Sequence, residues 1–287
     1  MSPQGSKETR ADNCQIYLIT ESVLVKRLGQ RFKQVYRQGP VETRLQEAAL
    51  SQWYRTSVGQ ELLAAEVDLI SRAISGRFGS MMVQLDSGAH EPLFEKRLFG
   101  AGTLVSQLEN RAPCPVICAK PENLPFEPES IDMLLMHHTL DICENPYQVI
   151  REGAIALKPG GVLIVLGFNP YSLWGLRALI QGRGEGAGIW HSRFLRSGRV
   201  EDWMHLLDFE LERHEKHLFY PPYRRPSWLQ RLNFGGRVQR RLLPFTGAVY
   251  LLVGYKQVLG RLPAAEKRVK RGFLEPVVSI NSKVRHK

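Results

Sequence analysis

Five short apolar runs, separated by turn-forming residues, follow one another from residue 81 onward: MMVQLD (81–86), GTLVSQLE (102–109), CPVICAK (114–120), SIDMLLMHH (130–138) and GVLIVLGF (161–168). Later in the chain, ELERHEKHLFY (210–220) and GAVYLLVGYK (247–256) have the appearance of two more strands. Runs of Val, Ile and Leu with little polar alternation are typical of strands that are buried on both faces of a sheet. The pattern therefore predicts seven strands.

Helical periodicity fills the segments between these runs. Residues 60–74 carry a broad apolar face, which predicts an amphipathic helix, and a later helix is expected over 199–207. Between the fourth and fifth runs, Asn145 can cap a helix with Pro146 at its first position, and the turn at 158–161 (Lys-Pro-Gly-Gly) ends it. A strand–helix–strand crossover requires parallel pairing. The sequence therefore predicts an open, doubly wound, mostly parallel α/β sheet.

The length of 287 residues and the hydrophobic content of 43% suit one large domain with appendages. We expect an N-terminal helical extension over 1–50, with weak helical periodicity at 16–37, a principal domain over 51–256 with its core at 81–170, and a basic tail over 257–287. No apolar run is long enough for a transmembrane helix, and the polar start does not resemble a secretory signal. The four scattered cysteines indicate reduced thiols, so we expect a cytoplasmic protein.

Positive charge is concentrated near the C-terminus. Residues 222–287 contain fifteen Lys or Arg residues and two acidic residues, whereas the whole chain has a formal net charge of +11. Such a segment could contact nucleic acid or an anionic lipid surface, or it could be a solvated tail that keeps the protein in solution. Trp228 and Phe234 lie among the arginines and leave open a peripheral association with a membrane.

Ligands of doubly wound sheets bind at the carboxyl ends of the strands, so the residues that follow each run are candidates for the site. Asp86 and Gly88 follow the first run in the order Asp-Ser-Gly-Ala-His, where glycine lets the backbone approach a ligand. This loop lacks the three glycines of a dinucleotide site and the Gly-Lys-Ser/Thr of a phosphate loop. Glu109 ends the second run, where a carboxylate can accept both hydroxyls of a ribose. The alternative for the loop at Asp86 and Gly88 is an ordinary turn between a strand and a helix, and the alternative for Glu109 is a charge on the surface.

Two further groups of residues bear on the chemistry of the site. Leu124-Pro125-Phe126 follows the third run and forms a rigid apolar turn that could pack on an adenine ring. Cys114 and Cys118 lie in or beside a buried strand, and no second cysteine pair accompanies them. We therefore predict no metal site, although His137 and His138 follow on the next strand.

The segment from the third to the fifth run resembles a known protein family. The stretch ENLPFEPESIDMLLMHHTLDICENPYQVIREGAIALKPGGVLIVLGFNP combines the Leu-Pro-Phe turn, a strand, a His-containing loop, a helix with Arg-Glu and a Lys-Pro-Gly-Gly turn before a strand. Over about residues 120–170 it resembles class I S-adenosylmethionine-dependent methyltransferases of the type-11 group. From Trp53 onward, most of the chain resembles a bacterial branch of uncharacterised methyltransferase-like proteins.

The resemblance implies a Rossmann-like methyltransferase sheet, S-adenosylmethionine as the cofactor and in-line transfer of a methyl group to a bound nucleophile. It also implies roles for residues of this sequence: Asp86 and Gly88 beside the amino-acid part of the cofactor, Glu109 at the ribose, Glu122, Leu124 and Phe126 around the adenine, and His137 and His138 at the mouth of the methyl-transfer site. A small-molecule or lipid-like methyl acceptor is expected, and the basic residues 222–287 leave room for a nucleic acid.

Two positions depart from the family pattern. His90 stands where the first loop has its second glycine, and Lys120 stands where the adenine-side loop usually has an aspartate. Both support a second hypothesis, that the fold has lost catalysis and serves as a binding module for nucleic acid or another polyanion. His137 or His138 could be a base that removes a proton from the acceptor, since histidine titrates near neutrality; alternatively, both only shape the loop.

Overall fold

The computed structural model describes residues 43–108, 112–181, 190, 192–218 and 247–258. Within them it forms a seven-stranded sheet in the order β3-β2-β1-β4-β5-β7-β6, which confirms the predicted fold class. The strands are β1 (Gly79–Leu85), β2 (Phe99–Ser106), β3 (Val116–Cys118), β4 (Ile131–His137), β5 (Leu157–Phe168), β6 (Phe209–His217) and β7 (Val249–Lys256). Each overlaps one of the seven predicted strands.

The sheet is parallel from β3 to β5, and β7 inserts antiparallel between β5 and β6. The third strand is shorter than its apolar run, because it has only the three residues Val116–Cys118. Pro113 and Pro115 precede it, and proline has no N–H to donate to a ladder, which suits this position at the edge of the sheet.

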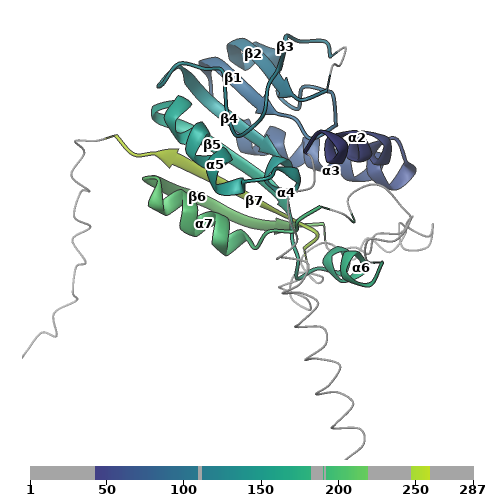
Figure 1. The fold of residues 1–287 in the computed structure, drawn as a ribbon. Coiled ribbons are helices and arrows are strands. Elements are labelled where there is room, and N and C mark those ends of the chain that lie inside the picture. Colours follow the sequence, from purple (N-terminus) through teal and green to yellow (C-terminus); the bar gives the residue numbers. More distant parts are fainter. Residues whose placement is uncertain (1–42, 109–111, 182–189, 191, 219–246, 259–287) are drawn as a thin grey trace, which may run out of the picture. The chain divides into compact units, whose positions relative to one another are not determined.

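Helices cover both faces of the sheet (Figure 1). The helices α2 (Thr43–Tyr54) and α3 (Ser57–Ile74) pack on one face, and α5 (Pro146–Ala156) and α7 (Ser197–Leu206) pack on the other. Successive side chains of β5 alternate between the two cores, because neighbouring residues of a strand point to opposite faces. This explains why its run is apolar at nearly every position.

Local signals in the sequence explain where the helices begin and end. The hydroxyl of Thr56 accepts a hydrogen bond from the N–H of Gly59 at the start of α3, which therefore begins slightly earlier than its apolar face predicts. Asn145 caps α5 in the same way, with Pro146 in the first turn. The helix ends at Ala156, and the chain continues directly into β5.

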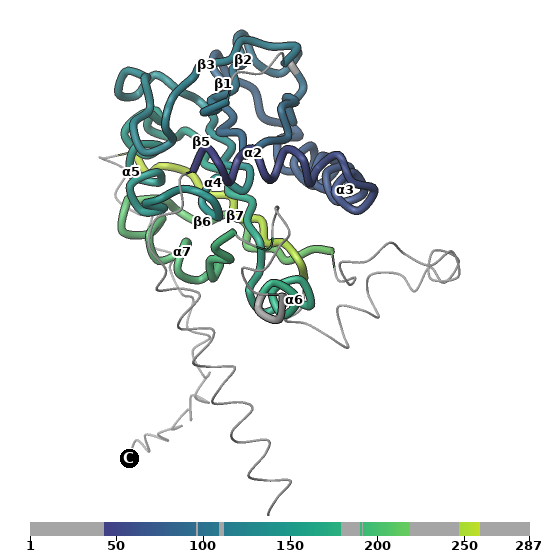
Figure 2. The backbone as a smooth tube through the Cα atoms, turned by 45° about the vertical axis from the view of Figure 1, so that its right-hand side comes forward, coloured from purple at the N-terminus to yellow at the C-terminus, as the bar shows by residue number. Residues whose placement is uncertain are grey.

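Three shorter or more peripheral elements complete the described structure: η1 (Lys96–Leu98), α4 (Thr139–Ile142) and α6 (Leu173–Gln181). Figure 2 shows α2 near α3 and α4, and α2 packs against both of them. The helix α2 straddles the predicted boundary at residue 50, and its first described residue is Thr43. The division into 1–50, 51–256 and 257–287 remains a prediction.

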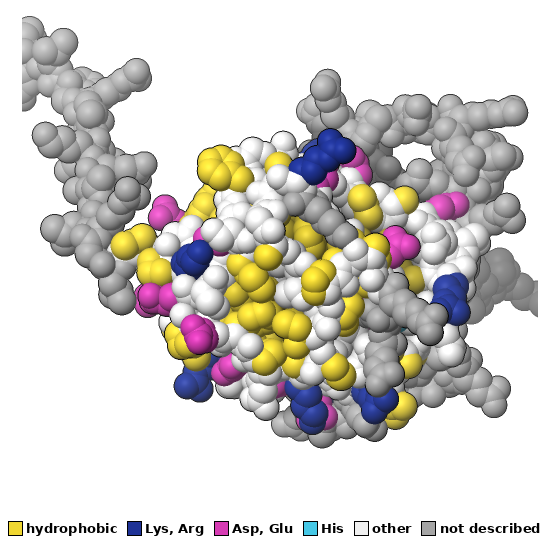
Figure 3. Space-filling model, turned by 90° about the horizontal axis from the view of Figure 1, so that it is seen from above, with side chains coloured by type: hydrophobic (Ala, Val, Ile, Leu, Met, Phe, Trp, Pro, Cys, Tyr) yellow, Lys and Arg dark blue, Asp and Glu magenta, His cyan; other side chains and the backbone are white. Residues whose placement is uncertain are grey.

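Several predicted features lie outside the described residues. They are the helical periodicity at 16–37, Glu109, Trp228, Phe234 and nearly all of the basic segment 222–287. Among the residues that the structure describes, no helix has the length and apolar character needed to cross a membrane. On the face shown in Figure 3, hydrophobic side chains gather in the middle, and charged side chains of both signs lie around them.

Candidate functional site

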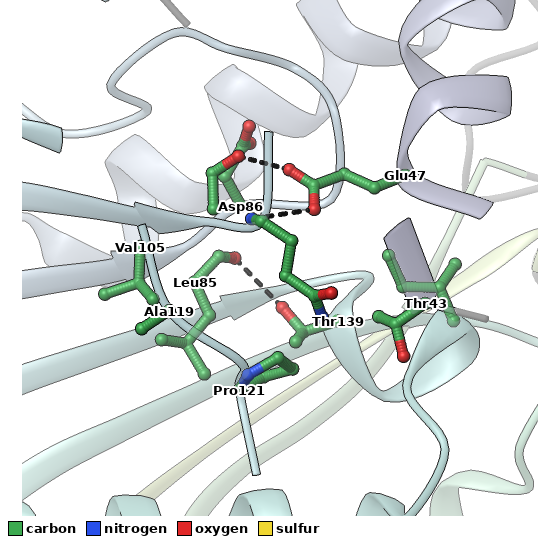
Figure 4. A pocket seen from close by; sticks show the side chains of 11 residues that line it. Thr43, Glu47, Leu85, Asp86, Val105, Ala119, Pro121 and Thr139 are labelled. Atoms are coloured by element: carbon green, nitrogen blue, oxygen red, sulfur yellow. Dashed lines mark hydrogen bonds between the residues drawn. The ribbon is translucent and has the colours of Figure 1, made fainter. Parts of the chain in front are cut away.

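A small hollow lies where β1, β2 and β3 end, under the helix α2 (Figure 4). Its cavity volume is about 10 Å³, which is room for no more than about one water molecule. Polar groups and apolar side chains both contribute to its wall, which is formed by Thr43, Glu47, Leu85, Asp86, Val105, Ser106, Gln107, Ala119, Pro121, Thr139 and Ile142. The hollow thus occupies the edge of the sheet at which the sequence places the site.

Asp86 follows β1 and organises the loop that comes after it. Its Oδ2 accepts hydrogen bonds from the N–H of Gly88 at 3.3 Å and of His90 at 2.9 Å. The imidazole of His90 also lies 3.3 Å from this oxygen, and the hydrogen bond to Asp86 raises the pKa of His90. The other oxygen, Oδ1, is buried and has no hydrogen-bond partner among the described residues. One acceptor at the wall of the hollow is therefore available to a ligand.

Gly88 is required by its backbone and by its neighbours. Its φ angle of +113° is in the region that side chains disfavour. A Cβ atom there would lie 2.7 Å from the carbonyl oxygen of Glu47 and 2.8 Å from the nitrogen of Ser51. The glycine therefore admits the backbone of α2, in place of the ligand that the sequence suggested as its close neighbour.

Glu47 brings a carboxylate from α2 to the end of β2. It is only 2% exposed, and its Oε2 accepts a hydrogen bond from the N–H of Gln107 at 3.0 Å. The hydroxyl of Ser106 contacts its Oε1. Burial raises the pKa of Glu47, the bonds from Ser106 and Gln107 oppose this rise, and the charge of Asp86 adds to it. A buried carboxylate with so few donors can accept further hydrogen bonds.

A second cluster of titratable groups lies behind the hollow and is fully buried. Glu66 of α3 contacts His138 Nε2 with Oε1 at 2.8 Å and His137 Nε2 with Oε2 at 3.0 Å. On its other side, His138 Nδ1 lies 3.0 Å from Asp141 Oδ2. Asp141 in turn accepts a hydrogen bond from the N–H of Phe168, at the end of β5.

The charges in this cluster follow from its geometry. Burial alone would lower the pKa of His138, but the charge of Glu66 and the hydrogen bonds to both carboxylates outweigh it and raise the pKa to about 9. Burial would likewise raise the pKa of Glu66, but His138 and His137 outweigh it and lower the pKa to about 2. At neutral pH, His138 is therefore an imidazolium that donates to two carboxylates.

Glu66, His137 and His138 also place three ligand atoms within 4.8 Å of one another, as do Glu47, Asp86 and His90. Each set has the residue types that could hold a metal ion. In the first set, Glu66 lies at hydrogen-bond distance from both histidines, whereas His137 Nδ1 is buried without a hydrogen-bond partner among the described residues. The negative charge of Glu66 is already offset by the imidazolium of His138.

The residues predicted for the adenine side lie apart from the wall of the hollow. Glu122 Oε1 accepts hydrogen bonds from the N–H groups of Glu144 and Asn145, so it holds the start of α5. Leu124 is buried in the core on the α5 side, and Phe126 packs against the same core. Of the predicted residues that the structure describes, only Asp86 lines the hollow, and Ala119 and Pro121 form the wall after β3.

The two departures from the family pattern do not block the hollow. His90 is half-buried and bonded to Asp86, and Lys120 is exposed; neither belongs to the wall. Glu47, by contrast, is part of the wall, and Figure 4 shows it reaching from α2 to its hydrogen bonds at the end of β2. The group that narrows the hollow on this side therefore comes from α2 and is neither of the two departures.

Sequence reasoning missed the two acidic residues Glu47 and Glu66. Both lie on the apolar faces of amphipathic helices, Glu47 with Leu50 in α2 and Glu66 with Leu62 and Ile70 in α3. A carboxylate at a position that helical spacing turns toward the core signals a buried polar function. That signal was present in both helices.

The groups around the hollow fit a nucleoside cofactor in their chemistry. Asp86 Oδ1 and Gln107 Nε2 are buried atoms without a hydrogen-bond partner among the described residues, and Leu85, Val105 and Ala119 supply apolar walls. An acceptor, a donor and apolar surfaces are what a ribose and an aromatic base require. The cavity volume of about 10 Å³ is far below the roughly 300–1,000 Å³ of typical small-molecule pockets, so the side chains at its wall must move apart before any part of a nucleoside can enter.

Comparison with known proteins gives a consistent result. Residues 100–165 match the family model of a methyltransferase domain of the type-11 group. The chain is 32% identical to the uncharacterised protein YafS of Escherichia coli K12 over 141 residues, which is 49% of this chain and 55% of that protein. It is 40% identical over 53 residues to the mitochondrial 2-methoxy-6-polyprenyl-1,4-benzoquinol methylase of Caenorhabditis elegans, which is 18% of this chain and 19% of that protein. The matched segments thus span about half and about a fifth of these relatives.

Among solved structures, a methyltransferase from Thermotoga maritima shares the fold. It is described as S-adenosylmethionine-dependent and as a possible histamine N-methyltransferase. The TM-score is 0.51 with 20% sequence identity, covering 72% of this chain and 93% of that chain. The protein therefore has the fold of class I S-adenosylmethionine-dependent methyltransferases, and its resemblance to their type-11 group is confirmed.

Proposed function

We propose that this protein is an S-adenosylmethionine-dependent methyltransferase that binds its cofactor at the ends of β1, β2 and β3. The observation that carries the proposal is the pair of buried, partnerless polar atoms, Asp86 Oδ1 and Gln107 Nε2, beside apolar walls in a chain with the methyltransferase fold. Buried polar atoms are rarely left without a partner, so a bound molecule, such as water or the cofactor, is expected to satisfy these two.

When bound, S-adenosylmethionine supplies an electrophilic methyl group to a nucleophile of the acceptor. The chain's part is to orient the two molecules and to exclude water. Asp86 holds the loop after β1 through two backbone N–H groups, and Thr139 ties the start of α4 to β1 by donating to the carbonyl of Leu85 at 2.9 Å. Both contacts fix the edge of the hollow.

For His137 and His138 we favour a positioning role over that of a base. His138 holds a proton at neutral pH, both histidines are fully buried, and both are bonded to Glu66. A protonated imidazole between two carboxylates cannot accept a proton from an acceptor. The cluster instead fixes the turn between β4 and α4, where His138 has a φ angle of +51°.

We propose a small-molecule or lipid-like acceptor. The name of the Caenorhabditis elegans relative describes a methylase of a polyprenyl-substituted benzoquinol, and this supports an acceptor of that general kind. We also propose a cytoplasmic location, because the four cysteines are few and scattered along the sequence.

Calorimetric titration of the full chain with S-adenosylmethionine tests the proposal. We expect a dissociation constant in the micromolar range and weaker binding to Asp86→Asn. The variant Asp68→Asn is the matched control, since Asp68 lies on the exposed side of α3. Absence of binding to the wild type at millimolar cofactor would refute the proposal and leave the fold as a binding module.

A further inference from the structure

The end of β2 lacks an acidic side chain among the described residues. Its last residue is Ser106, and Gln107 follows. In doubly wound folds, the strand after the first glycine-containing loop commonly provides the carboxylate that binds the ribose hydroxyls. Here the carboxylate beside the strand end belongs to Glu47, which comes from a helix earlier in the chain.

The contacts of Glu47 leave acceptor capacity at this place. Oε2 has one backbone donor, the N–H of Gln107 at 3.0 Å. Oε1 faces the hydroxyl of Ser106, which also lies 3.0 Å from the carbonyl oxygen of Leu108 and has only one hydrogen to donate. A carboxylate can accept about four hydrogen bonds. Glu47 is thus buried with donors for only part of its lone pairs.

The surroundings of Glu47 also favour a ligand that brings hydrogen-bond donors. A carboxylate oxygen of Asp86 lies within 4.8 Å of one of Glu47, and the charge of Asp86 raises the pKa of Glu47. Asp86 Oδ1 is also buried, without a hydrogen-bond partner among the described residues. Two neighbouring carboxylate oxygens attract donors and repel acceptors. The two hydroxyls of a ribose would supply two donors to this pair.

We infer that Glu47 binds the ribose hydroxyls of the nucleoside cofactor, the role that the sequence analysis gave to Glu109. The inference rests on the proposed function, because it names the residue that binds one part of the proposed cofactor. It makes α2 a component of the binding site. The contacts of Glu47 with Ser106 and Gln107 hold the strand end until the ribose joins them.

The test compares the affinity for a ligand that has the ribose 2′-hydroxyl with the affinity for one that lacks it. This ratio reports on the contact with the hydroxyl, whereas the overall affinity alone does not. S-Adenosylhomocysteine and its 2′-deoxy analogue are titrated into the full-length wild type and into Glu47→Gln, Glu47→Asp and Glu109→Gln. We expect the wild type to prefer the ribose form by at least about tenfold, or about 1.4 kcal/mol. Glu47→Gln retains the size of the side chain and should reduce this preference to about threefold or less.

Glu109→Gln is the matched control and should keep the wild-type preference. Glu47→Asp retains the charge with a shorter reach, and it should lose part of the preference; circular dichroism of each variant confirms that it is folded. If Glu109→Gln removes the preference and the Glu47 variants keep it, the inference is wrong and the proposed function stands. If the wild type binds neither compound at millimolar concentration, the proposed function fails together with the inference.

Discussion

Replacing Glu66 by Gln should strongly destabilise the protein, because it removes the charge that neutralises a buried imidazolium. Glu66 is fully buried and contacts both His137 and His138 at hydrogen-bond distance. Gln keeps the size of the side chain but carries no charge. His138 would then depend on Asp141 alone for a carboxylate.

The magnitude follows from the shift in the pKa of Glu66. The fall from 4.5 to about 2 corresponds to about 3 kcal/mol in favour of the ionised carboxylate in the folded state. Independently of this pKa, the removal of one partner from a buried ion pair typically lowers the free energy of unfolding by roughly 3–5 kcal/mol. We therefore expect the free energy of unfolding to fall by about 3–5 kcal/mol at pH 7.

The free energy of unfolding should also depend on pH, which provides a second measurement for this prediction. The pKa of His138 is raised from 6.5 to about 9 in the folded state, so its stabilisation is complete below pH 6.5 and is lost as the pH rises through 9. The pKa of Glu66 is lowered, so its stabilisation is present above pH 4.5 and is lost as the pH falls toward 2. Both shifts arise largely from one interaction and are not added.

Urea unfolding followed by circular dichroism at several pH values measures both effects. The control is Asp68→Asn, which changes an acid to its amide on the same helix at a surface pair with Arg72. Such pairs contribute at most about 0.5 kcal/mol. If Glu66→Gln unfolds within 1 kcal/mol of the wild type and keeps the same alkaline loss, the assignment of charges in the cluster is wrong.

Other substitutions test the packing around the site. Gly88→Val should weaken the binding of S-adenosylmethionine at least tenfold in calorimetry, because its Cβ would clash with the backbone of Glu47 and displace the carboxylate that we propose to bind the ribose. Thr56→Ala should cost about 1 kcal/mol in urea unfolding, because the N–H of Gly59 loses its cap. Trp174→Ala should cost about 3–5 kcal/mol, because the side chain is fully buried and lies edge-on to Trp53; a loss below 1 kcal/mol would contradict its place in the core.

The strands β4, β5 and β7 were predictable because they are buried on both faces over most of their length. In β5, Val162 and Ile164 face one core and Leu163 and Val165 face the other, so the run is apolar throughout and stands out in the sequence. The turn chemistry of Asn145 marked the start of α5 equally well. These signals are local, and they do not depend on which distant elements come together.

The site was only partly predictable, because two of its acidic residues come from helices that precede the sheet. Asp86 was found because it directly follows a strand, whereas Glu47 reaches the end of β2 only through the packing of α2 on the loop at Gly88. Spacing along the chain indicates that Glu47 and Glu66 face inward, but not what they meet there. Their partners, Ser106 and His138, depend on tertiary structure.

The two buried acids together explain how an altered first loop can remain compatible with a cofactor site. The loop after β1 lacks the second glycine, and its His90 is held back by Asp86 at the margin of the hollow. Glu66 anchors α3 to the turn after β4, and α2 packs against α3. Through α3, the position of α2 depends on the turn after β4. The position of the Glu47 carboxylate therefore depends on the ends of the strands beside the hollow. In this arrangement, helices supply part of the polar surface that the loops alone would otherwise provide.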